Sequence, residues 1–310
     1  MNGLELVAAG HYLPQKVLTN DMLSQMVETN DEWISKRTGI KTRYLCEGES
    51  NLDLAYKAAE NALAQTNIDR NKIAVLIVTT FTGDYYTPAM ANVLVERLNL
   101  RESIMAFDIN VACSSFAYAL KLTQSLLADD NESYALIIGS EELSKVTDFT
   151  DRSSCILFGD GAGAVLVKRK NGLFYSQMGT KSNVEALYCG GAGQENRYIQ
   201  MQGQEVFKFA ISILPKTIDE LLAQAGLTIN DIAWVICHQA NQRIIENVAR
   251  KYKANEKFYI NIDRYGNTSS ASIPIAISEL LQAGRLKKGD KIISVGFGAG
   301  LAWGGVLWEV

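Results

Sequence analysis

Short apolar runs alternate with segments of helical spacing along most of the chain, and this alternation restricts the fold more than any other feature. Residues 72–80 (KIAVLIVTT) and 134–139 (YALIIG) are mainly apolar runs, as expected for strands buried in a sheet. Residues 51–65 instead place leucines and alanines three and four positions apart, which indicates a helix with one apolar face. Alternation of this kind predicts an α/β fold with largely parallel sheets.

The second part of the chain repeats this order of elements. Helices are expected at 207–225, 241–252 and 271–283, and strands at 232–237, 291–295 and 305–308. We therefore expect two halves, residues 1–170 and 171–310, which share an order of elements but show no sequence repeat.

Composition argues against several classes of protein. The formal net charge is −4, so the chain has no overall positive field for nucleic acid. No apolar run approaches the ~20 residues that span a bilayer, and no secretion signal is visible, so we expect a cytoplasmic protein without membrane insertion. The cysteines are odd in number and lack a Cys-x-x-Cys pair, which argues against a zinc site and a disulfide framework. They are Cys46, Cys113, Cys155, Cys189 and Cys237.

Cys113 lies where a predicted strand, residues 104–111, is followed by a helix that begins near Ser114. The unpaired N–H groups at a helix N-terminus favour a thiolate and can help to hold an oxyanion. The alternative is a small buried thiol without chemistry, because free cysteines are among the most buried residues.

Two polar residues of the second half are further candidates. His238 directly follows the predicted strand 232–237, and ligands often bind at the carboxyl ends of strands in α/β proteins. The alternative is a polar residue that only ends the strand. Asn267, in YGNTSSASIP, taken by itself fits a turn followed by a helix cap better than a functional residue. The other histidine, His11, lies in a turn-like segment and is expected to be structural.

Two glycine-rich segments differ from known binding loops. Residues 158–164 (FGDGAGA) lack the GxGxxG spacing and precede a strand-like run, so they do not support a dinucleotide fold. Residues 296–300 (GFGAG) lie between two predicted strands, where glycines either let backbone N–H groups approach a reacting carbonyl or form a tight turn.

Taken together, these segments resemble the β-ketoacyl-ACP synthase III family, the initiating condensing enzymes of the thiolase superfamily. The order of HQAN and GNTS after the cysteine distinguishes this family from thiolases, which use a second cysteine, and from plant-type synthases. The matching motifs run nearly from end to end. They are DEWISKRTGI (31–40), DINVACSSFAYAL (108–120), DRSSCILFGDGAGAVL (151–166), MQGQEVFKFA (201–210), CHQANQRII (237–245), YGNTSSASIPIA (265–276) and GFGAGLAWG (296–304).

The resemblance implies a five-layered αβαβα fold of two similar halves, assembled as a homodimer. It implies that Cys113 is the acylated nucleophile, that His238 and Asn267 complete the triad, and that the backbone N–H groups of Cys113 and Ala299 form the oxyanion site. The implied reaction joins an acyl-CoA primer to malonyl-acyl carrier protein, with loss of carbon dioxide. A neutral histidine and an amide can stabilise the resulting enolate, so no metal and no cofactor beyond the coenzyme A thioester is expected.

The resemblance also implies binding residues. Coenzyme A is expected at Trp33, Arg37 and Arg152, the acyl carrier protein at Gln239, Ala240, Asn241, Gln242 and Arg243, and the acyl pocket at Tyr85, Tyr86 and Phe297. Forked guanidinium groups suit phosphates, and an indole ring offers a stacking face for adenine. Residues 243–257 hold five cations against two anions, a net +3. A solvated helix face explains such a run, but its position next to His238 favours docking of an acidic carrier protein.

The chain departs from the family pattern near the expected acyl pocket. The segment 81–90 (FTGDYYTPAM) is bulkier and more polar than usual, and Asn110, Ser114 and Ser115 replace small apolar residues around the nucleophile. Acetyl is the default primer, and a polar or unusual acyl group in a specialised pathway remains open. The alternatives for function are a related acyltransferase that does not decarboxylate and a non-catalytic partner subunit.

Overall fold

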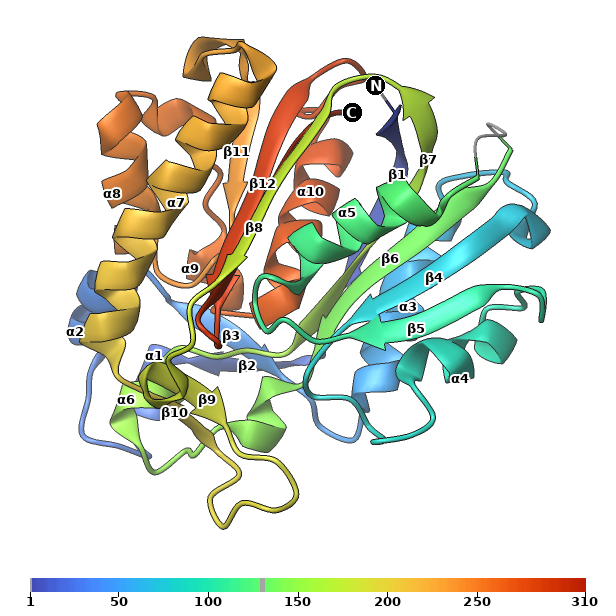
Figure 1. Cartoon of the computed structure of the whole chain (residues 1–310). Coiled ribbons are helices and arrows are strands. Elements are labelled where there is room, and N and C mark those ends of the chain that lie inside the picture. The colour runs from blue at the N-terminus through green and yellow to red at the C-terminus, as the bar shows by residue number, and fades with distance from the viewer. Residues whose placement is uncertain (1, 129–131) are drawn as a thin grey trace.

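The first of two main sheets comes from the N-terminal half of the chain (Figure 1). The computed structural model describes residues 2–128 and 132–310. The strands of this sheet follow the order β1-β7-β6-β4-β5. They are β1 (Asn2–Tyr12), β4 (Ile73–Thr79), β5 (Met105–Ile109), β6 (Tyr134–Glu141) and β7 (Gly161–Asn171).

The second sheet comes from the C-terminal half and follows the order β11-β12-β13-β8. Its strands are β8 (Phe174–Thr180), β11 (Trp234–Cys237), β12 (Lys291–Gly298) and β13 (Ala302–Glu309). The chain passes from the first sheet to the second between Asn171 and Phe174.

Helices form three layers around the two sheets. The central layer, α5 (Ser115–Leu126) and α10 (Ser272–Gln282), shares one core with both sheets. The outer layers are α3 (Asn51–Leu63) with α4 (Met90–Arg97) on the first sheet, and α7 (Gly203–Ala225) with α8 (Gln242–Tyr252) on the second. The five-layered αβαβα fold predicted from the resemblance is thereby confirmed.

Smaller elements complete the chain around one end of the layers. The short strands are β2 (Lys16–Thr19), β3 (Thr42–Leu45), β9 (Leu187–Cys189) and β10 (Ile199–Met201), and the short helices are α1 (Asn20–Leu23), α2 (Asp31–Thr38), α6 (Arg152–Cys155) and α9 (Ile262–Tyr265). Single 3-10 turns lie at Arg70–Lys72, Leu143–Val146, Val184–Ala186, Ile229–Asp231, Asn255–Lys257 and Ser269–Ala271.

The prediction of largely parallel sheets was wrong. β4 pairs in parallel with β5 and β6, and β11 with β12, but β7 runs antiparallel to β1 and β6. β13 runs antiparallel to both of its neighbours. Only residues 299–301 connect β12 to β13, which is too short for the crossover that a parallel pair needs.

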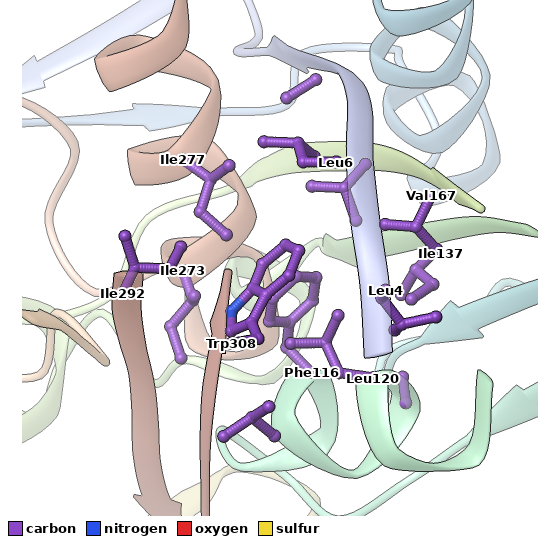
Figure 2. Packing of buried hydrophobic residues seen from close by; sticks show 14 of the residues in the cluster. Leu4, Leu6, Phe116, Leu120, Ile137, Val167, Ile273, Ile277, Ile292 and Trp308 are labelled. Carbon is purple, nitrogen blue, oxygen red and sulfur yellow. The ribbon is translucent and has the colours of Figure 1, made fainter. Parts of the chain in front are cut away.

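The central core packs large apolar side chains between the sheets. Figure 2 shows Trp308 of β13 and Phe116 of α5 close together, among leucines and isoleucines of both sheets and of α10. Both aromatic side chains are fully buried. Burying a side chain of this size contributes about 1.5–3 kcal/mol, so this core fixes α5 and α10 firmly between the sheets.

Local sequence explains where the helices begin. At α3, Ser50 Oγ accepts from Asp53 N–H, and Asp53 Oδ2 accepts from Ser50 N–H, which satisfies two otherwise unpaired donors. At α2, Asn30 accepts from Trp33 N–H, and Gly39 ends the helix at a φ of 82°.

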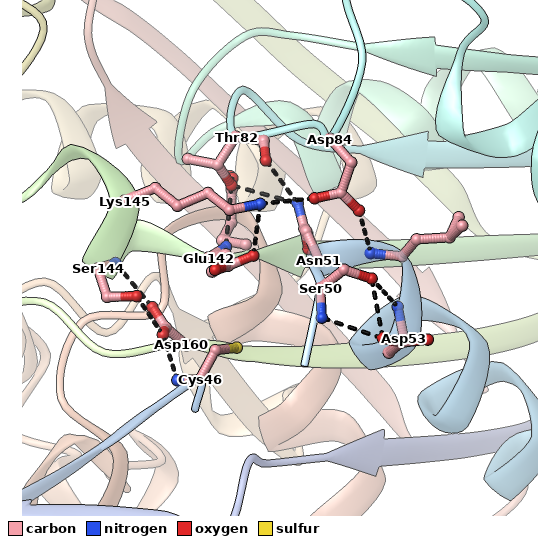
Figure 3. Close-up of polar contacts among 12 residues, drawn as sticks. Cys46, Ser50, Asn51, Asp53, Thr82, Asp84, Glu142, Ser144, Lys145 and Asp160 are labelled. Atoms are coloured by element: carbon pink, nitrogen blue, oxygen red, sulfur yellow. Dashed lines mark hydrogen bonds and ion pairs between the residues drawn. The ribbon is translucent and has the colours of Figure 1, made fainter. Parts of the chain in front are cut away.

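The loops that follow β4 and β6 are tied together by polar contacts. Lys145 binds Asp84 and Glu142, each at 2.6 Å, and Asp84 also accepts from the backbone N–H of Leu52 (Figure 3). These contacts hold the segment after β4 against the start of α3.

No helix in the described ranges, 2–128 and 132–310, is long and apolar enough to cross a bilayer.

Candidate active site

Cys113 lies between the end of β5 and the start of α5, as the sequence predicted. The residue before it, Ala112, adopts a left-handed φ of 46°, a strained conformation of the kind that recurs at active sites. β12 lies directly against this turn. A Cβ on Gly298 would lie 2.8 Å from Cys113 N, and one on Gly296 would lie 3.0 Å from Cys113 O. The glycines of GFGAG therefore allow the two backbones to approach closely.

His238 directly follows β11, and its ring is almost completely buried. Nδ1 lies 2.8 Å from Ser272 Oγ, and the ring packs edge-on against Phe297 with centroids 5.8 Å apart. Burial lowers the pKa of His238 to about 3, although a backbone hydrogen bond with Ser269 opposes this shift. The imidazole is therefore neutral at physiological pH.

Asn267 belongs to a turn and to the cavity wall at the same time. Its backbone N–H donates to Leu157 O at 2.8 Å, and its side-chain Oδ1 accepts from Ser269 N–H at 2.8 Å. The second bond identifies the oxygen end of the amide and leaves the NH₂ group as a donor. The turn predicted at this position thus orients the amide.

One cavity of about 820 Å³ connects the three residues with most of the other predicted positions. Of the residues singled out from the sequence, its lining includes Trp33, Arg37, Asn110, Cys113, Arg152, His238, Ala240, Asn241, Arg243, Asn267, Phe297 and Ala299. Residues more than two hundred positions apart in the chain therefore meet in this cavity.

An exposed aromatic and cationic group lies along the cavity. The guanidinium of Arg152 lies 5.1 Å from the ring centroid of Trp33 and donates to Glu28 O. Arg37 lies one helical turn after Trp33 on α2, and all three side chains are exposed. A flat ring beside two guanidinium groups can bind an aromatic base and its phosphates.

The remaining walls are mostly apolar. They include Phe81, Leu143, Ile156, Leu157, Phe158, Leu187, Ile199, Met201 and Val206, with Cys189 as a second cavity-lining thiol. Most of these residues belong to one hydrophobic cluster around β9, β10 and α6. An apolar chain attached to Cys113 would therefore find apolar surroundings.

Two predicted acyl-pocket residues do not reach the cavity of the single chain. Tyr85 and Tyr86 are 55% and 88% exposed and lie outside the lining. Their segment is held away from the cavity by Asp84, which is tied to Lys145 and Leu52 N–H. Within one chain, only Phe297 of the predicted pocket residues lines the cavity.

Gln239, which was expected at the carrier-protein site, has a buried side chain. Its amide donates to the carbonyls of Cys237 and Tyr259 and accepts from Asn261 N–H. It therefore connects β11 to a neighbouring loop. Gln242 bonds Glu246 one turn along α8 and packs against Gly39.

Three residues at the site were missed by the sequence reasoning. Ser269 Oγ lies 3.2 Å from Cys113 Sγ, Ser272 contacts His238, and the buried Glu141 lies behind Ser269. From the sequence alone, the run of hydroxyls after Asn267 indicates only helix capping. Two acidic residues at the end of an apolar strand, Glu141 and Glu142, were an available signal, since strand ends carry sites in α/β folds.

The thiol of Cys113 is protonated in this environment. Burial raises its pKa to about 12, and the charge of Glu141 adds to this shift, whereas the hydrogen bond to Ser269 opposes it. The expectation that the helix N-terminus would favour a thiolate omitted these larger effects. Chemistry at Cys113 therefore requires a route for its proton.

The five-layered fold and a cavity that joins a cysteine, a histidine and an asparagine define a thiolase-fold acyltransferase of the condensing type. Residues 107–182 match the family model described as 3-oxoacyl-[acyl-carrier-protein (ACP)] synthase III, and residues 222–310 match the model of its C-terminal part. The chain belongs to the β-ketoacyl-[acyl-carrier-protein] synthase III family.

Similar proteins match over their whole length. The beta-ketoacyl-[acyl-carrier-protein] synthase III of Clostridium acetobutylicum is 40% identical over 321 residues, which cover 99% of this chain and 98% of the relative. The Acholeplasma laidlawii protein of the same name is 41% identical over 314 residues, with the same coverage of both chains. The crystal structure of the Aquifex aeolicus 3-oxoacyl-[acyl-carrier-protein] synthase III aligns with a TM-score of 0.94 at 39% identity, covering 99% of this chain and 100% of that one.

Proposed function

We propose that this chain is a 3-oxoacyl-[acyl-carrier-protein] synthase III. It would condense an acyl-CoA primer with malonyl-acyl carrier protein and so initiate fatty acid or related acyl-chain synthesis. The observation that carries the proposal is the meeting of Cys113, His238 and Asn267 in one cavity that also holds Trp33, Arg37 and Arg152.

In the first half-reaction, Cys113 accepts the acyl group. Trp33, Arg37 and Arg152 hold the nucleotide, and the thioester carbonyl lies against the turn between β5 and α5. The Cys113 thiolate attacks this carbonyl, and the backbone N–H groups of Cys113 and Ala299 stabilise the oxyanion. Collapse of the intermediate releases coenzyme A and leaves an acyl-cysteine.

In the second half-reaction, a malonyl thioester loses carbon dioxide. Ser272 Oγ accepts from Gln239 N–H and lies 2.8 Å from His238 Nδ1. In this proposal the hydroxyl donates to Nδ1, and the neutral ring carries its proton on Nε2. Nε2–H and the amide of Asn267 donate to the thioester oxygen and stabilise the enolate. The enolate carbon attacks the acyl-cysteine, forming the new C–C bond and releasing the Cys113 thiolate.

The primer is an apolar acyl group. The cavity walls beyond Cys113 are leucine, isoleucine, phenylalanine and methionine side chains, which favour acetyl or a longer hydrocarbon chain over a polar group. This proposal retains acetyl as the default.

The carrier protein docks beside the start of α8. Arg243 is exposed there and stacks over Phe207 at 5.6 Å, while Ala240 and Asn241 line the cavity. Other cations of the run are partly engaged, since Lys251 binds Asp219 and Lys257 binds two backbone carbonyls. Arg243 is therefore the main docking contact for an acidic partner.

Homodimer assembly and a cytoplasmic location are part of the same proposal. β5 is an edge strand of the first sheet, Met105 on it is 50% exposed, and Tyr86 in the segment after β4 is 88% exposed. An exposed strand edge with apolar side chains is suited to pairing between chains. Sedimentation equilibrium tests this, and a monomer at micromolar concentration would contradict it.

Intact-protein mass spectrometry tests the function. Wild type incubated with a panel of acyl-CoAs gains one acyl group, Cys113→Ala gains none, and Cys189→Ala, which removes the other cavity thiol, still acylates. Malonyl-acyl carrier protein then releases carbon dioxide and a 3-oxoacyl product. Acylation without carbon dioxide release would instead identify a non-decarboxylating acyltransferase, and the absence of any adduct would identify a non-catalytic subunit.

A further inference from the structure

A hydrogen-bonded chain runs from the nucleophile into the buried interior. Cys113 Sγ lies 3.2 Å from Ser269 Oγ, and Ser269 Oγ lies 3.0 Å from Glu141 Oε1. The side chains come from three different segments, at the start of α5, the 3-10 turn before α10, and the end of β6. Ser269 adopts a left-handed φ of 49°, so backbone strain is accepted to place this hydroxyl between the other two groups.

Glu141 is fully buried and is surrounded by donors. Oε1 accepts from Ser269 and Ser270, and Oε2 accepts from Thr80, Thr82 and the backbone N–H of Phe81. Within the part of the chain that the structure describes, no lysine or arginine forms an ion pair with this carboxylate. The neighbouring Glu142 turns away and binds Lys145.

A buried carboxylate that lacks an ion-pair partner costs folding free energy, because burial disfavours its charge. Burial raises the pKa of Glu141, and the surrounding hydrogen bonds only partly oppose this. The hydrogen bonds that both of its oxygens accept stabilise the ionised form, which is the form that can receive a proton. The charge of Glu141 acts on two thiols, Cys113 and Cys189, and contributes to the raised pKa of each.

We propose that Ser269 and Glu141 form a proton relay for Cys113, in which Glu141 receives through the Ser269 hydroxyl the proton that the thiol loses on acylation. As the sulfur–carbonyl bond forms, the thiol proton passes to Ser269 Oγ and the hydroxyl proton passes to Glu141 Oε1. The thioester bond to coenzyme A breaks, and its sulfur leaves with the electron pair and takes a proton from water.

The relay runs in reverse during condensation. When the enolate carbon attacks the acyl group, the bond between this group and Cys113 breaks, and the sulfur leaves as a thiolate. Glu141 returns its proton through Ser269 to this thiolate. The free enzyme is then restored with a protonated thiol and an ionised carboxylate. This inference rests on the acyl transfer proposed above.

Electrostatics alone predicts the opposite result for a substitution at Glu141. The negative charge of Glu141 raises the pKa of the Cys113 thiol, so Glu141→Gln would lower that pKa and speed reactions of the thiol if charge were the only effect. A relay predicts that the same variant slows them, because glutamine accepts no proton. Whether Glu141→Gln speeds or slows the reaction of Cys113 therefore distinguishes a pure charge effect from a proton relay.

The experiment measures alkylation of Cys113 by iodoacetamide between pH 6 and 9 in the full-length protein, with peptide mass spectrometry to separate Cys113 from the other cysteines. At pH 8 we expect Glu141→Gln and Ser269→Ala to react at least about tenfold more slowly than wild type, since a positioned base commonly contributes 10²–10⁴-fold. In wild type, the relay lets Cys113 react at pH values below the pKa of its thiol. Both variants lose this reaction, so their alkylation rate at low pH falls more than that of wild type.

Ser270→Ala is the matched control. Ser270 bonds the same carboxylate oxygen at 2.9 Å, but its hydroxyl is shared with Thr79 O rather than with the thiol. We expect the alkylation rate of Cys113 in Ser270→Ala to stay within about threefold of wild type, the scale of one weakened hydrogen bond. If Glu141→Gln fails to fold, Ser269→Ala compared with Ser270→Ala decides the question.

Two outcomes overturn the relay: Glu141→Gln reacting as fast as wild type or faster, or Ser269→Ala and Ser270→Ala behaving alike. Alkylation needs no acyl-CoA, so the result stands even if the proposed condensing function fails. Conversely, an acyl-enzyme that forms at the wild-type rate in Ser269→Ala would support the function and refute the relay.

Discussion

The hydroxyl of Ser272 lies 2.8 Å from Nδ1 of His238, and the same oxygen accepts from the backbone N–H of Gln239. Ser272 is the first residue of α10, so the central helix layer sets the orientation of the imidazole at the end of β11. The orientation of the histidine therefore depends on a contact between two elements that are separate in the sequence, β11 and α10.

The neutral state of His238 makes the protein sensitive to acid. Its pKa falls from an ordinary 6.5 to about 3 on folding, so between these values the unfolded chain binds a proton that the folded chain does not. Stability is thus highest above pH 6.5 and falls as the pH is lowered toward 3. We expect the free energy of unfolding of wild type to fall between pH 6.5 and pH 5, with His238 responsible for about 1–2 kcal/mol of the loss.

Urea unfolding at the two pH values measures this effect, and His238→Asn reduces the loss. His11→Asn is the comparison, because burial lowers the pKa of His11 as well. A pH dependence unchanged in His238→Asn would contradict a buried neutral imidazole.

His238→Ala separates the two half-reactions. Because His238 acts on the malonyl thioester and not on the thiol, the variant still forms the acyl-cysteine but condenses at least about a hundredfold more slowly, the usual loss for one oxyanion donor. Acyl-enzyme is measured by mass spectrometry and condensation by carbon dioxide release. His11→Ala, the other histidine, should leave both unchanged, and equal losses of both steps in His238→Ala would refute the assignment.

Arg243→Glu tests the docking surface. Reversing an exposed charge beside the cavity repels an acidic carrier protein, so KM for malonyl-acyl carrier protein rises by about tenfold while KM for acyl-CoA changes less. Lys216→Glu on α7 makes the same change of charge at another exposed position. Comparable changes in both KM values, or the same effect from both variants, would remove Arg243 from the docking contact.

Arg43 is fully buried and stabilises the fold, and among the described residues it forms no ion pair with a carboxylate. Its guanidinium donates to Leu18 O, Asn20 Oδ1 and Ile156 O, which joins the antiparallel pair β2–β3 to the residue after α6. Arg43→Met leaves these acceptors without a donor, and we expect the free energy of unfolding to fall by about 2–4 kcal/mol. Urea denaturation measures it, and the exposed Lys41→Met serves as control. A loss below about 0.5 kcal/mol, typical of surface changes, would contradict the role.

Local pattern alone was enough to predict most helices and strands, whereas the roles of Cys113, His238 and Asn267 were expected only from the resemblance to the family. Periodic apolar residues predicted α3 and the strands β4 and β6, and Cys113 lies at the strand-to-helix turn where the sequence placed it. Such features depend on neighbours within a few positions, which is the range over which side-chain periodicity and helix capping act. The motifs around His238 and Asn267 identified the family for the same reason.

Only the tertiary structure decided which residues meet. The sequence contains no local sign that Ser269 would lie between Cys113 and Glu141, which are separated from it by 156 and 128 positions. Nor does it show that Gln239 turns inward or that Tyr86 turns outward, since loop side chains follow no period. The direction of the strands and the proton environment of the thiol likewise arise from long-range packing, because burial and charge act through space.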